Sequence, residues 1–140
     1  MPRDCIFCKI VSGAAPAQRV HEDELTVSFM DAFPASRGHL LVVPKRHYAD
    51  LLGADDASLA RVVANSRRIA LALKAALAPD GIGVHQLNGA AAGQTVFHYH
   101  MHLIPRRMGD PIGFHGRRRA DEPELAEVAA EIARALAEIA

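Results

Sequence analysis

Three histidines separated by single residues carry the strongest chemical signal in this chain. His98, His100 and His102 alternate with a tyrosine and a methionine. Strand periodicity would place all three imidazoles on one face of a strand over residues 98–104. The Cα atoms of the first and last would then lie about 13 Å apart, too far for one tetrahedral metal with bonds of about 2.1 Å to gather the triplet. The three must divide their roles, and the neutral imidazole of the central one is a nucleophile that can attack phosphorus.

A run of small residues stands directly before these histidines. Residues 88–95 read NGAAAGQT. Backbone N–H groups in such a loop can point inward as an anion-binding nest, and Gln94 and Thr95 add side-chain donors. The segment is not a nucleotide-binding P-loop, because no lysine follows Gly93. Alone it is equally well interpreted as a flexible loop, but beside three histidines it predicts a phosphate cradle next to a nucleophile.

The two cysteines form a separate motif. Cys5 and Cys8 have the spacing that usually supplies half of a zinc site, and two histidines would have to complete it. They lie too close together for the bridge that stabilises a secreted domain. A redox disulfide is the alternative, although such pairs usually follow a strand and open a helix, which a position five residues from the start does not offer. A zinc ion with four protein ligands would be structural, since no position stays open for substrate.

Hydropathy patterning predicts the strands that would position these residues. One segment alternates apolar and polar side chains before Asp31, which indicates a half-buried strand. Two β-branched apolar runs are typical of strands in the middle of a sheet, and Pro105 is expected to close the histidine strand. The predicted strands are residues 25–30, 38–44, 82–88 and 98–104.

Two segments have helical spacing. The first is expected to begin at Asp55 or Asp56 and to end before Pro79, giving a helix of about 20 residues. The second follows Asp121 or Glu122, with Pro123 in its first turn and an acidic outer face. These elements predict an α+β fold: an antiparallel sheet, one long helix, and a C-terminal helix packed on the core or on a second subunit. The apolar helix positions are Leu59, Val62, Val63, Ile69, Leu73 and Leu77, then Leu125, Val128, Ala129, Ile132, Leu136 and Ile139.

Length and composition limit the kinds of protein to which this chain can belong. With 140 residues, 50% of them hydrophobic and 23% charged, the chain is expected to form one domain over residues 1–140, with 106–140 as a loop-plus-helix extension. Sixteen basic and sixteen acidic residues leave no net field to attract nucleic acid or an anionic membrane. No apolar run reaches membrane-spanning length and the start lacks a secretory signal, so a cytoplasmic location is expected. Five arginines between 106 and 119 are interpreted as a solvated or substrate-facing loop.

The chain resembles the histidine-triad (HIT) family of nucleotide-binding proteins, whose motif is His-φ-His-φ-His-φ-φ with φ apolar. Here the motif is HYHMHLI over 98–104, preceded by GQTV over 93–96. The likeness continues in CIFCKI over 5–10, at Asp31, and in GHLLVVPKRH over 38–47, and so covers about residues 4–107. Four separated blocks make it specific, and the cysteine pair is typical of the zinc-containing bacterial branch.

The resemblance implies a nucleotidyl hydrolase or transferase. His100 matches the nucleophile, which attacks the α-phosphorus and forms a nucleotidyl-histidine intermediate that water hydrolyses. His102 matches the histidine near the phosphate and leaving group, and His39 a supporting histidine beside the nucleophile. Asp31 would accept hydrogen bonds from ribose hydroxyls, and Gln94 and Thr95 would hold the phosphate. The base pocket would be lined by Ile6, Phe7, Ile10, Phe29 and Leu41, and the structural zinc ion would be bound by Cys5, Cys8, His47 and His98.

One position departs from the family pattern. Many relatives have an amide where this chain has Leu87, and Asn88 follows one residue later, so it reaches the ligand only if the loop begins there. Purine mononucleotides with a phosphoramidate or similar leaving group are the implied substrates, and a homodimer is the implied assembly. Cleavage of dinucleoside polyphosphates, or non-catalytic nucleotide binding, stays open as an alternative. Three other histidines have no partner pattern and are interpreted as ordinary: His21, His85 and His115.

Overall fold

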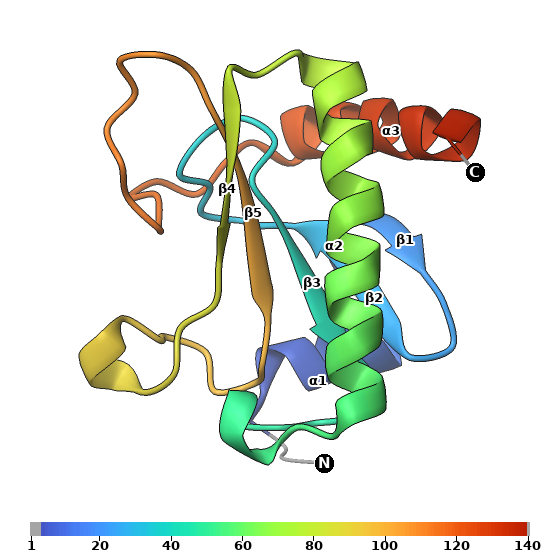
Figure 1. Cartoon of the computed structure of the whole chain (residues 1–140), viewed down its shortest axis with the longest axis vertical. Coiled ribbons are helices and arrows are strands. Elements are labelled where there is room, and N and C mark those ends of the chain that lie inside the picture. The colour runs from blue at the N-terminus through green and yellow to red at the C-terminus, as the bar shows by residue number, and fades with distance from the viewer. Residues whose placement is uncertain (1–3, 140) are drawn as a thin grey trace.

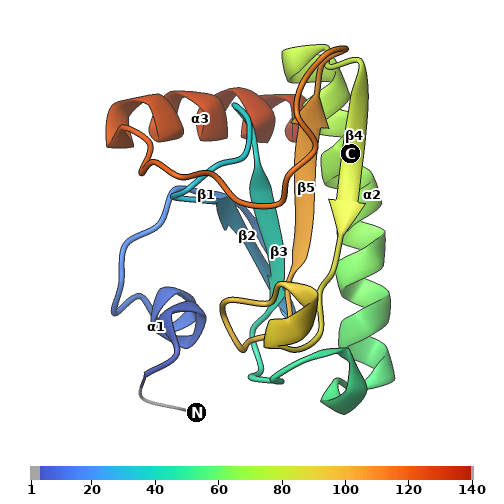
Figure 2. The same ribbon diagram turned by 90° about the vertical axis from the view of Figure 1, so that its left-hand side faces the viewer.

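A five-stranded antiparallel sheet with helices on both faces organises the chain, as the computed structural model of residues 4–139 shows (Figures 1 and 2). This arrangement confirms the predicted α+β class. Across the sheet the strands run β1 (Arg19–Glu22), β2 (Thr26–Met30), β3 (Leu40–Pro44), β5 (Met101–Arg106) and β4 (Gly81–His85). The helices are α1 (Ile6–Ser12), α2 (Asp56–Leu77) and α3 (Glu122–Ile139), with short 3-10 turns η1 (Leu51–Gly53) and η2 (Ala90–Ala92).

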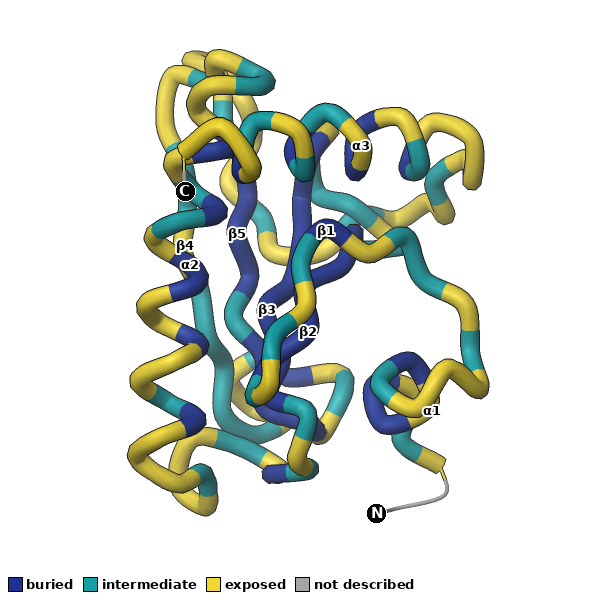
Figure 3. Tube along the Cα trace, turned by 90° about the vertical axis from the view of Figure 1, so that its right-hand side faces the viewer, coloured by how far each residue is buried: buried dark blue, intermediate teal, exposed yellow. Residues whose placement is uncertain are grey.

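Both faces of the central strands are buried, because helices cover each of them (Figure 3). In β3, Leu40 and Val42 pack into the core formed with α2 and α3, whereas Leu41 and Val43 pack into a second cluster with α1. Strand β2 is fully buried for the same reason, so the expectation of a half-buried strand is wrong. Its polar residues Thr26 and Ser28 lie inside the protein and do not face solvent.

The histidine strand begins later and ends later than predicted. Strand β5 starts at Met101 and passes through Pro105 to Arg106, so His98 and His100 lie in the segment before it. Strand β3 pairs with β5 no further than Leu103, and the missing N–H of Pro105 therefore costs no hydrogen bond on that side. Since His98 lies outside the strand, period-two alternation no longer holds it on the face of His102, and its ring is free to turn elsewhere.

Three short elements also differ from the prediction. Strand β4 stops at His85 and forms one edge of the sheet, so the expected central strand over 82–88 is wrong in length and place. Strand β1 and helix α1 were not predicted. Helix α1 has only seven residues, and burial of Phe7 and Ile10 against the sheet stabilises a segment that would be marginal alone.

The two long helices, α2 and α3, begin where the sequence predicts them. Asp55 is the N-cap of α2 and accepts a hydrogen bond from the Ser58 N–H, and Pro123 lies in the first turn of α3. Helix α3 lies across the end of α2 and packs on the core through its apolar stripe (Figure 1). Of the predicted apolar positions of α2, only Val63 faces away, with 56% of its surface exposed. Within residues 4–139, no helix is long and apolar enough to span a membrane.

The turn between β1 and β2 is tied to α2 by Asp23. Its carboxylate accepts from the N–H groups of Leu25 and Thr26 and from the side chains of Asn65 and Arg61. Burial opposes the charge, but these donors outweigh it and the pKa of Asp23 is lowered. We expect Asp23→Ala to lower the free energy of unfolding by about 2–3 kcal/mol, because several donors lose a charged acceptor.

The pH dependence of stability is the control for the role of the Asp23 carboxylate. Since the carboxyl pKa is lower in the folded than in the unfolded protein, its stabilising effect is present above the unfolded value of 3.8 and is lost as the pH falls towards the folded value. The stability difference between the original protein and Asp23→Asn, measured by urea unfolding, should be largest near neutral pH and should shrink below pH ~4. An equal difference at both pH values would contradict this assignment.

Candidate active site and metal site

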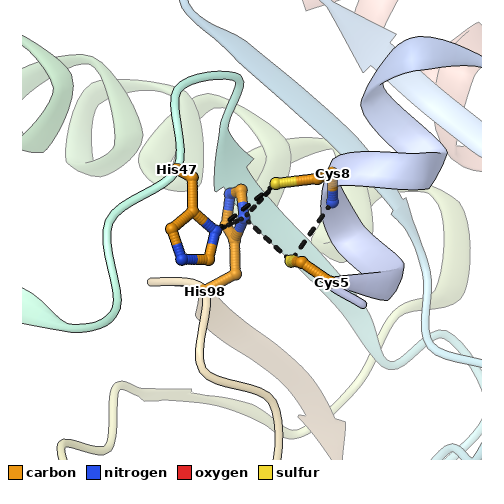
Figure 4. Close-up of side chains that lie close together, drawn as sticks. All are labelled: Cys5, Cys8, His47 and His98. Carbon is orange, nitrogen blue, oxygen red and sulfur yellow. Dashed lines mark hydrogen bonds between the residues drawn. The ribbon is translucent and has the colours of Figure 1, made fainter. Parts of the chain in front are cut away.

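Four predicted metal ligands meet where α1 packs beside the sheet (Figure 4). Cys5 caps the N-terminus of α1 and Cys8 lies in its first turn, so one helical turn brings the two sulfurs to the same side. His47 follows β3, and His98 turns out of the segment before β5. The four potential ligand atoms all lie within 4.8 Å of one another.

The distances fit a tetrahedral zinc ion. Zinc bonds of about 2.3 Å to sulfur and 2.05 Å to nitrogen give tetrahedron edges of about 3.6 Å for sulfur to nitrogen and 3.3 Å between nitrogens. The Sγ atom of Cys8 lies 3.4 Å from Nδ1 of His47 and 3.6 Å from Nδ1 of His98, and the two Nδ1 atoms are 3.2 Å apart. Sγ of Cys5 lies 3.4 Å from Nδ1 of His98.

Proton positions and charge favour a cation in this cluster. Nε2 of His98 donates to the Pro44 carbonyl at 2.8 Å, which leaves a lone pair on Nδ1 towards the sulfurs. Burial and the adjacent Cys5 thiol raise the pKa of Cys8 to about 11, so two neighbouring thiolates need a positive ion to be stable together. Zinc, which prefers thiolate and imidazole ligands, would supply that charge.

The central histidine of the triad is held in one tautomer. Nδ1 of His100 lies 2.6 Å from the His98 carbonyl oxygen, which can only accept, so Nδ1 carries the proton. The lone pair is then on Nε2. Burial lowers the pKa of His100 below its usual 6.5, so the ring is neutral at pH 7. Phe7 packs edge-on against this ring with centroids 5.0 Å apart, which fixes its orientation.

A chain of hydrogen bonds fixes the third histidine in the opposite tautomer. The Ala35 N–H donates to Nδ1 of His39 at 2.9 Å, so the His39 proton is on Nε2. That atom lies 2.9 Å from Nδ1 of His102, which must accept, and the remaining proton of neutral His102 is on Nε2. Burial lowers the pKa of His102 to about 2 and that of His39 to about 3, so both rings stay neutral. His39 therefore bonds directly to His102, whereas the resemblance implied a position beside His100.

The predicted nucleotide residues gather around one cavity of about 580 Å³. Phe29, Leu41 and His102 are direct cross-strand partners in β2, β3 and β5, and so they share the sheet face opposite α2. Helix α1 closes the apolar end of the cavity. Asp31 lies at its side, where burial raises the pKa of its carboxyl and the Phe33 N–H donates to one oxygen at 2.8 Å. The predicted residues that line it are Ile6, Phe7, Ile10, Phe29, Asp31, Leu41, Thr95, His100 and His102.

Two predicted binding residues are used inside the protein and do not line the cavity. Oε1 of Gln94 accepts from the Gly89 N–H at 2.7 Å and Nε2 donates to the Ala49 carbonyl at 2.7 Å, so the buried amide holds the 88–95 loop closed. Oδ1 of Asn88 accepts from the Leu51 N–H at 2.8 Å and so binds η1. The structure therefore does not bring either side chain to a ligand in the cavity.

Several cavity residues were missed by sequence reasoning. Ala15, Pro16 and Ala17 line the apolar end, and the stretch is short and carries no motif. His115 and Arg119 line the other side, although His115 was interpreted as ordinary. Their position depends on how the loop between β5 and α3 folds back over the sheet (Figure 2), and no periodic pattern signals that path.

The sequence and the fold both match a known family. The model for the HIT domain matches residues 12–109. The chain belongs to the HIT domain family. It is 39% identical over 138 residues to protein hit of Bacillus subtilis, covering 96% of this chain and 95% of the relative. The HIT fold superimposes on the crystal structure of a Zn-bound histidine triad family protein from Mycobacterium smegmatis with a TM-score of 0.86 and 41% identity, over 96% of this chain and 94% of that one.

The name of another HIT relative states an enzymatic activity. The chain is 37% identical over 110 residues to the adenylylsulfatase HINT3 of Arabidopsis thaliana, covering 79% of this chain and 56% of that protein. The family membership confirms the resemblance seen in the histidine motif and its neighbouring blocks.

Proposed function

We propose that this HIT protein hydrolyses or transfers the nucleotidyl group of purine nucleoside monophosphate derivatives through a covalent bond to His100. One observation carries the proposal: a neutral imidazole with its Nδ1–H bound to a backbone carbonyl lines a cavity of nucleotide size. An imidazole locked in this way has one free lone pair and needs no deprotonation before attack. Thr95, at the end of the 88–95 loop, and the adjacent His102 line the cavity and supply donors that a phosphoryl group requires.

The cavity has distinct ends for the parts of a nucleotide. Phe7, Ile10, Phe29 and Leu41 form an apolar slot in which a purine base can lie. Asp31, at the side of the slot, is placed to accept from ribose hydroxyls. Thr95 lines the cavity beside the histidines and is placed to donate to the phosphate.

The reaction follows from the tautomers. Nε2 of His100 attacks the α-phosphorus, and the electron pair of the bond to the leaving group departs with that group. The Nε2–H of His102 donates to the phosphoryl oxygen as charge develops there. In the second step water attacks phosphorus and releases a proton to solvent, while the P–N bond breaks and its electron pair returns to Nε2 of His100. Release of a nucleoside monophosphate restores the starting state.

Asp31 gives a specific test of nucleotide orientation. We expect Asp31→Ala to weaken AMP binding by about 10- to 100-fold, because a charged acceptor for ribose hydroxyls is lost. Isothermal titration with AMP and with its 2′-deoxy analogue checks the contact. The original protein should prefer AMP, whereas Asp31→Ala should bind both nucleotides alike. A variant that still discriminated between them would show that Asp31 does not contact the ribose.

The leaving group is best assigned by a substrate panel. Adenosine phosphoramidate, adenylyl sulfate and a diadenosine polyphosphate share the adenylyl group and differ only beyond the α-phosphorus. The HINT3 relationship supports including the sulfate. Turnover of at least one member is expected, and the preferred member defines the class. AMP binding without turnover of any member would favour the non-catalytic alternative.

We propose a structural role for zinc. Four protein ligands leave no open position for substrate, and the ion would join α1 to the segments after β3 and before β5. The thiol ligands must stay reduced, which supports a cytoplasmic location.

A homodimer is the proposed assembly. Strand β4 forms an edge of the sheet with Val84 51% exposed, and the outer side of α2 carries exposed Val63. Light scattering checks this assembly, and a monomeric mass at micromolar concentration would exclude it.

A further inference from the structure

The loop between β5 and α3 brings a fourth imidazole into the active-site cavity. In Figure 2 this loop passes in front of β5 and β3, on the face that carries the histidines. The ring of His115 packs edge-on against that of His102 with centroids 5.5 Å apart, and its Nε2 lies 3.3 Å from the Gly93 carbonyl. His115 lines the cavity together with His100, yet its side chain is also exposed to solvent.

Several contacts fix the path of this loop. Phe114 packs against His85 with ring centroids 4.6 Å apart, and His85 is the direct β4 partner of His102. The Gly116 N–H donates to the Phe33 carbonyl at 2.9 Å, and the Arg106 guanidinium donates to the Gly113 carbonyl. His115 is therefore held between two anchored neighbours and does not lie on a free chain.

Close packing at Gly116 makes this placement specific. A Cβ atom added at this residue would lie 2.0 Å from the Pro34 carbonyl oxygen and 2.7 Å from its carbon. Because the obstructing atoms are backbone, they cannot move aside as the end of a flexible side chain would. Any larger residue at 116 must push the loop, and His115 with it, away from the cavity.

The other histidines of the site leave a role for this ring. The Nδ1–H of His100 is bound to the His98 carbonyl, and the Nε2–H of His39 is bound to His102. Of these three rings, His102 lines the cavity and keeps an Nε2–H that neither of the other two accepts, and in the proposed reaction that group donates to the phosphoryl oxygen. A basic leaving group needs a second donor that can exchange its proton with water, and the exposed ring of His115 meets that requirement.

We infer that His115 is a catalytic residue that donates a proton to the leaving group, which makes this site suited to substrates with basic leaving groups such as alkylamines. The inference rests on the proposed function. As the bond between Nε2 of His100 and phosphorus forms, the P–N bond of the substrate breaks and its electron pair stays on the departing nitrogen. The His115 imidazolium keeps the Nε2–H that lies against the Gly93 carbonyl, gives its Nδ1 proton to the departing nitrogen, becomes neutral, and regains a proton from solvent.

Two substrates with the same adenylyl group separate this role from a structural one. An alkylamine amidate of AMP has a leaving group that must be protonated, whereas the 4-nitrophenyl ester of AMP has one that departs unaided. The ratio kcat/KM reports the steps up to loss of the leaving group. We expect His115→Ala to lower kcat/KM for the amidate about 100-fold and for the ester less than about twofold, with AMP affinity unchanged.

Further variants sharpen the test. His115→Gln can donate a hydrogen bond but cannot transfer a proton, so it should stay defective on the amidate. Gly116→Ala should reproduce the selective loss, because it displaces the loop. Ile112→Ala, in the same loop with 84% of its surface exposed, should leave both substrates unaffected.

The outcomes distinguish this inference from the proposed function. An equal loss on both substrates, or no loss on either, would overturn the role of His115 while leaving His100 in place. If the original protein turned over neither substrate, the proposed function would fail and the inference with it.

Discussion

His100→Ala is expected to lower turnover of adenosine phosphoramidate by about 10³-fold or more while AMP still binds. The reason is local: the Nε2 lone pair of His100 is the only free imidazole lone pair that the tautomers of His39, His100 and His102 leave available. Steady-state kinetics and isothermal titration with AMP measure the two quantities separately.

A matched variant removes the nucleophile and keeps the local packing. His100→Asn places an amide N–H where Nδ1 stands, and so it retains the hydrogen bond to the His98 carbonyl. It should be as inactive as His100→Ala and should melt within about 3 °C of the original protein. His21→Gln, on β1 and away from the cavity, controls for the loss of an imidazole. Full activity in His100→Asn would exclude His100 as nucleophile.

Loss of zinc is expected to have the largest effect on stability. Cys8→Ala removes one of four ligands, and the apparent stability supplied by a structural zinc site is then reduced by several kcal/mol. For a chain of this size that change lowers Tm by about 10 °C or more. Metal analysis should find one zinc ion per chain in the original protein and almost none in the variant.

A chelator separates the effect of the metal from that of the side chain. It should lower Tm of the original protein to near that of Cys8→Ala and should leave the variant unchanged. His100→Asn, which touches no ligand atom, should respond to the chelator as the original protein does. Fewer than about half a zinc ion per chain in carefully prepared protein, or an equal response of the original protein and Cys8→Ala to the chelator, would argue against the four-ligand site.

Much of the fold was predictable because its signals are long. The α2 helix has an N-cap at Asp55 and a stripe of apolar residues through Leu73, and β3 is a β-branched run that ends at Pro44. The short elements lack such signals. The four residues of β1 form a strand because they pair with β2, and α1 is stabilised by tertiary contacts that a local pattern does not contain. The available sign of α1 in the sequence was a helical spacing at Phe7 and Ile10 followed by Gly13, which the structure shows as a C-cap with a φ of 85°.

The candidate site was predictable where residue type determines the chemistry. Cys5 and Cys8 and the spaced histidines could be proposed because few roles suit such groups, whereas the role of Asp31 came from the family resemblance. The hydrogen-bond partners of the candidate residues could not be predicted in this way. Gln94 reads as a phosphate donor, but its amide is occupied by Gly89 and Ala49, which only the folded loop brings together.

His115 shows the other limit of sequence reasoning. Its place depends on Gly116 lying against Pro34 and on Phe114 lying against His85, and these contacts join segments 29 to 82 positions apart in the chain. The expected strand over 98–104 failed for a related reason. The orientation of His98 is set by the Pro44 carbonyl and the cysteine sulfurs, and not by strand periodicity.

The most direct measurement of the central claim is mass spectrometry of protein quenched during turnover of an adenylyl substrate. Peptide mapping should find a single adenylyl group, attached to Nε2 of His100, and none in His100→Asn treated in the same way. An adduct on another residue, or rapid turnover with no adduct at any quenching time, would contradict covalent catalysis by this histidine.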